Sequence, residues 1–248
     1  MQVWIYSLFS VLIVSLISLV GLFTLSIKEN LLKNILIYSI SFSAGALFGD
    51  VFIHLLPEII KKTGLTAQLS SFVLLGIVVS LFIEKIIHWR HCHMPVNKTH
   101  VHRFAYMNLF GDSIHNFIDG LIIGAAYLIS IPVGMATTMA VIFHEIPQEI
   151  GDFGVLIHAG LNRKKALMYN FLTATTAILG TIIAILISSK IEGATNMLSA
   201  FAAGSFIYIA GSDLIPELHK ETELKKSVIQ IFTFILGIAI MYGLLVVE

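Results

Sequence analysis

Long stretches of mostly apolar residues recur along the whole chain, and they constrain its fold more than any other feature. A helix of about 20 apolar residues crosses the hydrocarbon core of a bilayer, which is roughly 30 Å thick. Hydrophobic residues make up 57% of the 248 residues and charged residues 12%, whereas a soluble domain is usually about 25% charged. The sequence therefore predicts an all-α polytopic membrane protein with one transmembrane domain over residues 1–248. The eight predicted transmembrane helices cover about residues 3–25, 32–56, 69–88, 103–129, 132–158, 165–189, 195–217 and 228–247.

Basic residues are distributed unevenly between the two sides of these spans. The segments that follow spans 1, 3, 5 and 7 contain 12 of the 15 lysine and arginine residues. Cytoplasmic loops carry such an excess of positive charge, so the pattern predicts that these segments are cytoplasmic and that both termini are extracytoplasmic. One of these segments, at about residues 89–102, is a histidine-containing loop. We expect an integral, multi-pass protein of the cell membrane, which is the inner membrane if the source is bacterial.

Several function classes are disfavoured by composition and motifs. The formal net charge is zero, which gives no argument for nucleic-acid binding. No phosphate-binding loop of the G-x-x-x-x-G-K-[ST] type is present, so the sequence does not suggest ATP-driven work. Cys92 is the single cysteine, which excludes an intramolecular disulfide.

Two segments of the chain match each other without a gap. Ala44–Gly45 and His54–Glu58 in span 2 correspond to Ala203–Gly204 and Asp213–Glu217 in span 7, each 159 positions later. Since the segments lie five spans apart, they cross the membrane in opposite directions, as in the inverted repeats of secondary transporters. The match predicts a 3+2+3 arrangement, in which spans 1–3 and 6–8 form an inverted repeat around spans 4 and 5. The alternative is a chance similarity between two helix ends that both contain Pro-Glu.

Spans 4 and 5 carry charged and polar side chains near their middle. A carboxylate at the centre of a membrane helix costs roughly 2.5–3.5 kcal/mol on insertion scales. Helical spacing puts Asp112, His115 and Asp119 on one face of span 4, with Asn116 beside them. In span 5, His144 and Gln148 form one row, and Glu145, Glu149 and Asp152 form a second row beside it. The short connection at Ser130–Pro132 makes the two spans antiparallel neighbours, so both clusters should lie at a similar depth.

The side-chain types in these clusters indicate a divalent-metal site. Imidazole, carboxylate and amide oxygen suit Zn²⁺, Fe²⁺ or Mn²⁺, and the lack of thiolate argues against a structural zinc cage. Contacts that only join helices are the alternative, but such contacts average about 0.6 kcal/mol in membranes. Pro147 should also free the carbonyl group of Phe143 as an extra acceptor. We expect the metal ligands to come from His115, Asp119, His144 and Glu145, with Asn116, Gln148 and Glu149 as further candidates.

The two clusters resemble the signatures of a known family. His115–Gly120 resembles the H-N-F-x-D-G signature of span 4 in ZIP (ZRT/IRT-like) divalent-metal transporters. His144–Phe153 resembles the H-E-x-P-H-E-[LI]-[GS]-D-[FY] signature of span 5 in the subfamily with histidine-rich cytoplasmic loops. Gly49–Pro57 is similar to span 2 of that subfamily. The similarity covers essentially the whole chain.

This resemblance implies eight spans, outward termini and a binuclear metal site near the membrane midplane. One ion would be held by His115, Asp119, His144 and Gln148, and the other by Asn116, Asp119, Glu145 and Gln148. The resemblance also implies metal movement toward the cytoplasm. The subfamily commonly has histidine where this chain has Gln148. A neutral amide does not bridge two ions strongly, so we expect Gln148 to weaken the second position and to shift the metal preference.

Polar residues also lie toward the ends of spans 2 and 7. Asp50, His54 and Glu58 form one stripe at the outer end of span 2, and Asp213 and Glu217 form a shorter stripe at the inner end of span 7. We interpret these stripes as residues that pass the ion along at opposite mouths of a pathway. The alternative is that they are ordinary residues of the membrane interface, and this alternative suits Glu58 and Glu217. The predicted pathway residues are Asp50, His54, Asp112, Asp152 and Asp213. His91 and His93 could catch an ion weakly in the cytoplasmic loop.

Two other functions compete with metal transport. An intramembrane zinc metalloprotease would use His144–Gln148 as an H-E-x-x-H motif, but its second histidine is replaced by Gln148 and Pro147 interrupts the helix. A cation/proton exchanger would leave His115 and Asn116 unexplained.

We predict that the protein is a transporter and not an enzyme. It should move divalent metal ions, most readily zinc, by alternating access, and it should need no resident cofactor. The expected partners are metal ions and the lipid bilayer. The sequence also permits a homodimer, because Gly120 and Gly124 allow close helix contact.

Overall fold

The computed structural model describes residues 2–24, 29–89, 103–190 and 193–245, and it has no strand within these ranges. The α-helices are α1 (Gln2–Ile17), α2 (Gly21–Thr24), α3 (Glu29–Gly49), α4 (Leu56–Thr63), α5 (Ala67–Trp89), α6 (Arg103–Ile129), α7 (Ile131–His158), α8 (Arg163–Ala174), α9 (Thr176–Ser188), α10 (Ala194–Tyr208), α11 (Ile215–Leu218) and α12 (Leu224–Leu244). A 3₁₀ turn, η1 (Ser18–Val20), and two π-helical segments, η2 (Asp50–Leu55) and η3 (Ile209–Leu214), connect some of them. The predicted all-α class is confirmed for the described residues. The histidine-containing loop lies outside them, apart from Trp89.

Six helical runs are long and apolar enough to cross a membrane, as expected for a polytopic membrane protein. They are Gln2–Phe23, Ile35–Thr63, Ala67–Lys85, Arg163–Ser188, Ala194–Leu218 and Leu224–Leu244. These runs match six of the eight predicted spans. The other two predicted spans correspond to α6 and α7, which are 27 and 28 residues long but carry the polar clusters, which lower their hydropathy.

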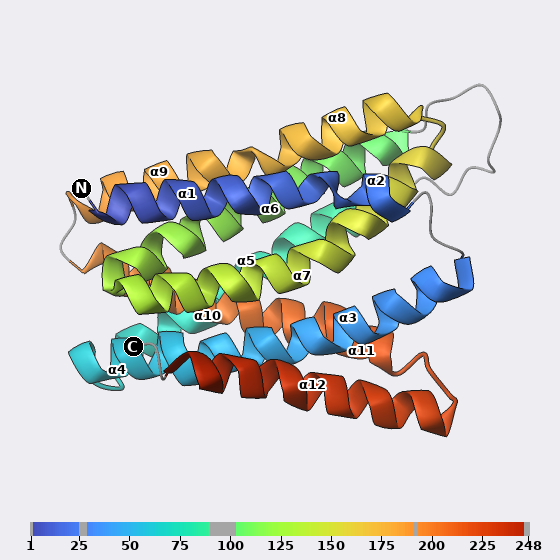
Figure 1. Cartoon of the computed structure of the whole chain (residues 1–248). Coiled ribbons are helices and arrows are strands. Elements are labelled where there is room, and N and C mark those ends of the chain that lie inside the picture. Colours follow the sequence, from blue (N-terminus) through green and yellow to red (C-terminus); the bar gives the residue numbers. More distant parts are fainter. Residues whose placement is uncertain (1, 25–28, 90–102, 191–192, 246–248) are drawn as a thin grey trace.

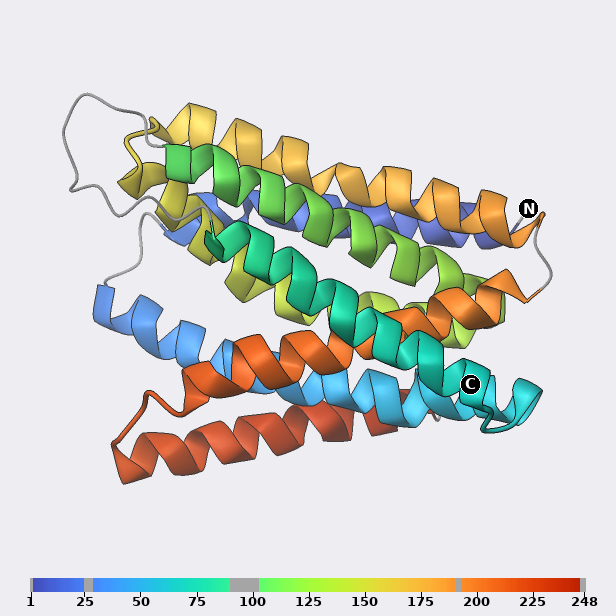
Figure 2. The ribbon, with the colours of Figure 1, turned by 180° about the vertical axis from the view of Figure 1, so that it is seen from behind.

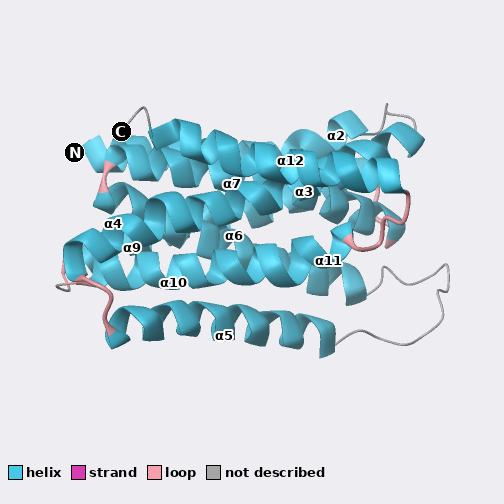
Figure 3. Ribbon diagram, turned by 90° about the horizontal axis from the view of Figure 1, so that it is seen from below, coloured by secondary structure: helices cyan, strands magenta, loops and turns pink. Residues whose placement is uncertain are grey.

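The helices pack side by side in two groups. The first helix group contains α1, α6, α7, α8 and α9, and the second contains α3, α4, α5, α10 and α12. In Figure 1, α1, α8 and α9 lie along the top of the molecule, and α3 and α12 lie along the bottom. The reverse view in Figure 2 shows α5 and α10 crossing between them, and Figure 3 shows α5 at one edge beside α10. The start of α1 and the end of α12 lie at the same end of the bundle, opposite α11 (Figure 1).

Small residues allow the closest helix contacts within each group. A Cβ atom at Gly120 of α6 would lie 1.9 Å from the carbonyl oxygen of Ala177 on α9. A Cβ atom at Gly45 of α3 would lie 2.0 Å from the carbonyl oxygen of Phe234 on α12. Because only glycine fits such approaches, these positions bring the helix backbones together. Gly124 also packs against α9, so it and Gly120 serve contacts within the chain rather than contacts between two copies.

The two matching sequence segments share a local distortion. The π-helical segment Asp50–Leu55 and the π-helical segment Ile209–Leu214 are separated by the same 159 positions as the sequence match. Each is followed by a proline in the first turn of the next helix, Pro57 in α4 and Pro216 in α11. Proline lacks the N–H that would bond to the carbonyl four residues earlier, and its ring crowds that carbonyl, which favours a widened preceding turn. The sequence repeat is therefore accompanied by a repeat in backbone geometry.

Candidate metal centre

The two helices that carry the polar clusters form an antiparallel hairpin. α6 ends at Ile129 and α7 begins at Ile131, so Ser130 alone connects them. The hydroxyl oxygen of Ser130 accepts a hydrogen bond from the Val133 backbone N–H at 3.3 Å and caps α7, while Pro132 occupies its first turn. α6 and α7 pack against each other. The predicted pairing of these helices is confirmed.

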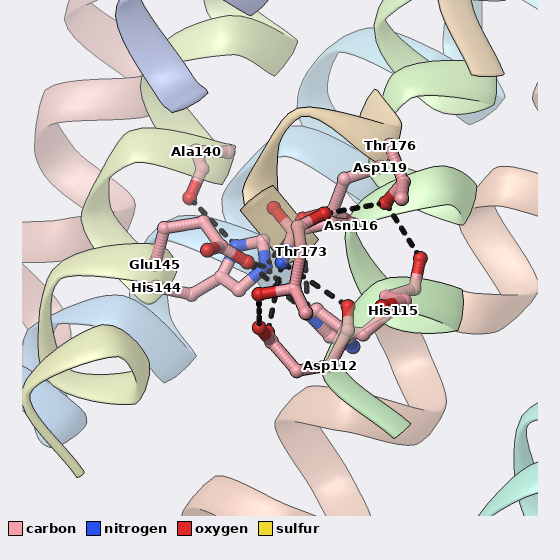
Figure 4. Close-up of polar contacts among 10 residues, drawn as sticks. Asp112, His115, Asn116, Asp119, Ala140, His144, Glu145, Thr173 and Thr176 are labelled. Atoms are coloured by element: carbon pink, nitrogen blue, oxygen red, sulfur yellow. Dashed lines mark hydrogen bonds and ion pairs between the residues drawn. The ribbon is translucent and has the colours of Figure 1, made fainter. Parts of the chain in front are cut away.

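Four side chains of the hairpin converge on one point, and we call them the metal cluster: His115, Asp119, His144 and Glu145. The Nε2 atoms of His115 and His144 lie 3.3 Å apart, and Asp119 Oδ2 lies 3.1 Å from His144 Nε2 and 3.7 Å from His115 Nε2. Glu145 Oε1 lies 3.4 Å from His115 Nε2 and 3.6 Å from His144 Nε2. Figure 4 shows these side chains reaching toward one another from α6 and α7.

The spacing of these atoms matches a tetrahedral metal site. Ligand atoms at about 2.0–2.2 Å from a tetrahedral Zn²⁺ lie roughly 3.3–3.6 Å from one another. The five distances above range from 3.1 to 3.7 Å. Two imidazole nitrogens and two carboxylate oxygens are a ligand set that suits Zn²⁺ and related first-row ions. The cluster can therefore surround one divalent ion with little rearrangement.

Hydrogen bonding prepares His144 to bind an ion through Nε2. Its Nδ1 lies 3.1 Å from the carbonyl oxygen of Ala140, one turn earlier on α7 (Figure 4). A carbonyl only accepts, so with the proton on Nδ1 in this contact the lone pair of Nε2, which lies 3.1 Å from Asp119 Oδ2, would be available to an ion. His144 is 1% exposed, and Asp119 and Glu145 are 0% exposed. Asp119 Oδ1 and both carboxylate oxygens of Glu145 have no hydrogen-bond partner among the described residues. Buried carboxylate oxygens that lack a hydrogen-bond partner are strongly favourable ligands for a cation.

A second set of buried polar residues lies next to the metal cluster, and we call it the hydrogen-bonded layer: Asp112, Asn116, Glu149, Asn170 and Thr173. The Asn116 side-chain amide donates to Asp112 Oδ1 at 2.8 Å and to the Asp112 carbonyl oxygen at 3.1 Å. Thr173 of α8 donates its hydroxyl to Asp112 Oδ2, and Asn170 of α8 donates its amide to Glu149 Oε2. Asn170 and Thr173 were not predicted. Their spacing of three positions in an apolar span was the available signal.

The remaining ligand candidates are placed less centrally. Glu145, rather than Gln148, supplies the fourth atom of the metal cluster. Gln148 is half-buried on α7, and its contact with an ion stays a prediction. Asp152 lies one turn further along α7 and accepts a hydrogen bond from the Asn108 side-chain amide at 2.9 Å.

Pro147 lies inside α7, as the sequence shows, but the carbonyl that it frees is already bonded. The Ser43 hydroxyl of α3 donates to the carbonyl oxygen of Phe143 at 2.5 Å. A side chain from the other helix group therefore bonds to this carbonyl, and this partner could not be read from the sequence of α7. A carbonyl oxygen has two lone pairs, so its role as an extra acceptor for an ion stays a prediction.

The predicted pathway residues of spans 2 and 7 have different environments. Asp50 and His54 are buried: Asp50 accepts a hydrogen bond from the Thr137 hydroxyl at 3.2 Å, and His54 Nε2 lies 2.8 Å from the carbonyl oxygen of Met241. Asp213 is exposed on η3 and lines a cavity of about 210 Å³ that extends to His115. The His115 side chain is 22% exposed, whereas the rest of the metal cluster is buried. A cavity beside Asp213 therefore extends to the partly exposed side of the metal cluster, whereas Asp50 and His54 are buried.

Comparisons with known proteins identify similar sequences. The family model described as ZIP Zinc transporter matches residues 1–104 and 96–245. The chain is 29% identical to Zinc transporter zipt-7.1 of Caenorhabditis briggsae, over 100% of this chain and 80% of that protein. It is 33% identical to Zinc transporter ZIP13 of Pongo abelii, over 82% of this chain and 64% of that protein. It is 39% identical to Zinc transporter ZIP10 of Danio rerio, over 58% of this chain but only 18% of that protein.

Proposed function

The chain belongs to the ZIP zinc transporter family, and from this premise we propose that it carries divalent metal ions, most readily zinc, across a membrane into the cytoplasm. The observation that carries the proposal is the convergence of two imidazole nitrogens and two carboxylate oxygens at tetrahedral spacing. Because the family consists of transporters, the chain is a transporter and not an enzyme. The metalloprotease alternative is not supported.

In the proposed site, His115 and His144 bind the ion through Nε2, and Asp119 and Glu145 offset its charge. The ion is the transported substrate and not a resident cofactor. Asn116, Gln148 and Glu149 are proposed as ligands of a second or transient position. This is supported by Asn116 Oδ1, Asp119 Oδ1 and Glu149 Oε1, which are buried without a hydrogen-bond partner among the described residues.

We propose that α6 and α7 also cross the membrane, which gives eight spans in a 3+2+3 arrangement with an inverted repeat. The equal offset of the two π-helical segments supports the repeat. The packing supports it too, because α3 of the first repeat contacts α12 of the second, while α5 of the first contacts α10 of the second. The uneven distribution of lysine and arginine supports extracytoplasmic termini. We propose the cell membrane as the location, the inner membrane in a bacterium, and a homodimer stays a prediction.

The proposed mechanism is alternating access by movement of the two helix groups against each other. All four residues of the metal cluster belong to the first helix group, so the bound ion moves with that group. Asp50 and His54 line the outer route and Asp213 the inner route, with Asp112 and Asp152 along the inner part of the hairpin. Hydrogen bonds between the groups include Thr137 to Asp50 and Lys62 to the carbonyl oxygen of Ile129 at 3.2 Å. These contacts must break for the outer side to open.

The proposal is tested with the full chain purified and reconstituted in liposomes. We expect zinc and cadmium to enter the liposomes down their gradient without ATP, and His115→Ala to abolish this uptake. Peptide-bond cleavage that survives Asp119→Ala, with no metal uptake by the unaltered protein, would overturn the proposal in favour of a protease. Uptake that needs an opposing proton gradient and survives His115→Ala would instead favour an exchanger.

A further inference from the structure

The start of α8 carries three consecutive basic residues, Arg163, Lys164 and Lys165, and we call them the basic patch. All three are exposed, and none of them forms an ion pair with a carboxylate among the described residues. Asn162 caps this end of α8, because its side-chain oxygen accepts a hydrogen bond from the Lys165 backbone N–H at 2.9 Å. The cap fixes the beginning of the helix, so the basic patch occupies its first turn.

The first turn of a helix is an unfavourable place for positive charge. The backbone N–H groups at a helix N-terminus carry a partial positive charge, which favours acidic residues there and disfavours basic ones. α8 has no acidic residue in its first turn, so the basic patch is not neutralised within that turn. An anion beside the basic patch would remove this repulsion, and the helix N-terminus would add to the attraction for a phosphate group.

The start of α12 offers a contrast within the same chain. Lys226 Nζ lies 2.9 Å from Glu223 Oε2 and 3.6 Å from Glu221 Oε2, and Lys220 forms an ion pair with Glu217. The chain itself therefore neutralises basic residues at α12. A preference for basic residues on one side of the membrane explains lysines at both helices, but it does not explain why the lysines of α8 have no carboxylate partner.

An apolar stripe continues from the basic patch along one face of α8 and α9. Its exposed members follow Lys164 and Lys165 at helical spacing, and they are Met168, Leu172, Leu179, Ile183 and Leu186. Arg163–Ser188 is also one of the runs that are apolar enough to cross a membrane, and α8 and α9 follow one another along one edge of the bundle (Figure 1). The order along this face, first positive and then apolar, is complementary to an anionic phospholipid with its head group and acyl chains.

We propose that the basic patch, together with Met168 and Leu172, binds an anionic phospholipid of the adjoining leaflet. In the proposed orientation this is the cytoplasmic leaflet. Each basic residue near an anionic lipid surface strengthens binding about fivefold. The inference goes beyond the proposed function, because lipid binding does not require metal transport.

α8 also carries Asn170 and Thr173, which donate to carboxylates of the hydrogen-bonded layer. A lipid that neutralises the first turn of α8 stabilises the helix that supplies both donors. The bound lipid therefore supports the first helix group from the membrane side.

Native mass spectrometry of the detergent-purified full chain tests this site by comparing phosphatidylglycerol with phosphatidylcholine of the same acyl chains. We expect the unaltered protein to retain phosphatidylglycerol in preference. The combined variant Arg163→Gln, Lys164→Gln and Lys165→Gln should bind it at least about tenfold more weakly. The matched control is the combined variant Lys220→Gln, Lys225→Gln and Lys226→Gln, which removes the same charge at α12 and should bind within about twofold of normal. Equal losses in the two variants, or equal retention of the two lipids by the unaltered protein, would overturn the proposal.

Thermal unfolding in detergent distinguishes a lipid from a free anion. A ligand that binds only the folded state raises the unfolding midpoint, so phosphatidylglycerol should raise it for the unaltered protein and less for the variant of the basic patch. An equal rise with inorganic phosphate alone would show a simple anion site and overturn the lipid assignment.

Single substitutions keep the test informative if the combined variant does not fold. Lys164→Gln and Lys165→Gln should each weaken phosphatidylglycerol binding about fivefold, whereas Lys164→Arg and Lys165→Arg should preserve it. Unchanged binding in both glutamine variants would contradict the proposal. These measurements contain no zinc, so their outcome is independent of whether the protein transports it.

Discussion

The metal cluster and the hydrogen-bonded layer are adjacent and both contain buried carboxylates, but their hydrogen bonding differs. In the hydrogen-bonded layer, each carboxylate has a donor: Asn116 and Thr173 donate to Asp112, and Asn170 donates to Glu149 Oε2, while Glu149 Oε1 has no hydrogen-bond partner among the described residues. In the metal cluster, both oxygens of Glu145 and one oxygen of Asp119 have no hydrogen-bond partner among the described residues. The nearest groups to these carboxylates are two imidazole nitrogens that also face each other.

This difference distinguishes a site for a movable ion from its support. A carboxylate that already has donors in the protein gains less from a cation than one that has none, because burial without a partner is unfavourable. The donors Asn170 and Thr173 come from α8, which packs against both α6 and α7. The layer therefore joins three helices of the first helix group, while the cluster beside it leaves its oxygens for the substrate.

The largest expected effect comes from removing one charge from the metal cluster. Asp119→Asn keeps the shape of the side chain, but Asp119 Oδ2 is the atom 3.1 Å from His144 Nε2 and 3.7 Å from His115 Nε2. We expect zinc uptake by liposomes to fall at least about 100-fold, because loss of a direct ligand should exceed the effect of altering a supporting group. Size-exclusion chromatography of the variant in detergent controls for folding. A folded Asp119→Asn protein with more than a tenth of normal uptake would contradict the assignment of this carboxylate.

The same exchange in the hydrogen-bonded layer should have a smaller effect. Asp112→Asn keeps an oxygen that Thr173 or Asn116 can bond to, although one of these two donors loses its acceptor. We expect zinc uptake to fall about tenfold, in the range typical of residues that support a metal ligand. The comparison with Asp119→Asn is made at equal amounts of folded protein. Equal losses in the two variants would show that the two layers act as one site.

The sequence could predict the metal cluster more fully than its support, and particular residues explain why. Helical periodicity groups side chains on one helix, so the sequence pattern alone places His115 and Asp119 together on α6. The single-residue connection at Ser130 then places α7 beside them. Periodicity does not say which side chain of a third helix meets a given carboxylate, so Thr173 and Asn170 were missed. For the same reason the contact of Ser43 with Phe143 could not be foreseen, since α3 lies 100 positions away in the chain.

A smaller effect is expected at Gln148, at the edge of the metal cluster. Gln148→His adds an imidazole one turn beyond His144 on the same face of α7. Since imidazole favours zinc over manganese, we expect the ratio of zinc to manganese uptake to rise about fivefold. The matched variant Gln148→Leu removes the amide without adding a ligand, and it should lower uptake of both ions. If both variants transport the two ions in the normal ratio and at the normal rate, Gln148 does not contact the ion.

The smallest expected effect tests whether α8 supports the hairpin through a single hydroxyl. Thr173→Val is nearly isosteric and removes the donor to Asp112, while Asn116 still donates to that carboxylate. We expect a lower thermal unfolding midpoint in detergent, equivalent to about 1 kcal/mol, and zinc uptake within about threefold of normal.

Thr175→Val is the matched control for this exchange, because Thr175 lies directly after α8 and its hydroxyl donates to the carbonyl oxygen of Leu172 in α8 at 2.6 Å. If Thr173→Val is no less stable than Thr175→Val, Thr173 does not support Asp112. If it abolishes uptake as Asp119→Asn should, the hydroxyl acts on the ion itself. A loss of stability with transport retained is the outcome that separates the two layers, since a supporting bond contributes to both conformations of the first helix group and so changes their balance little.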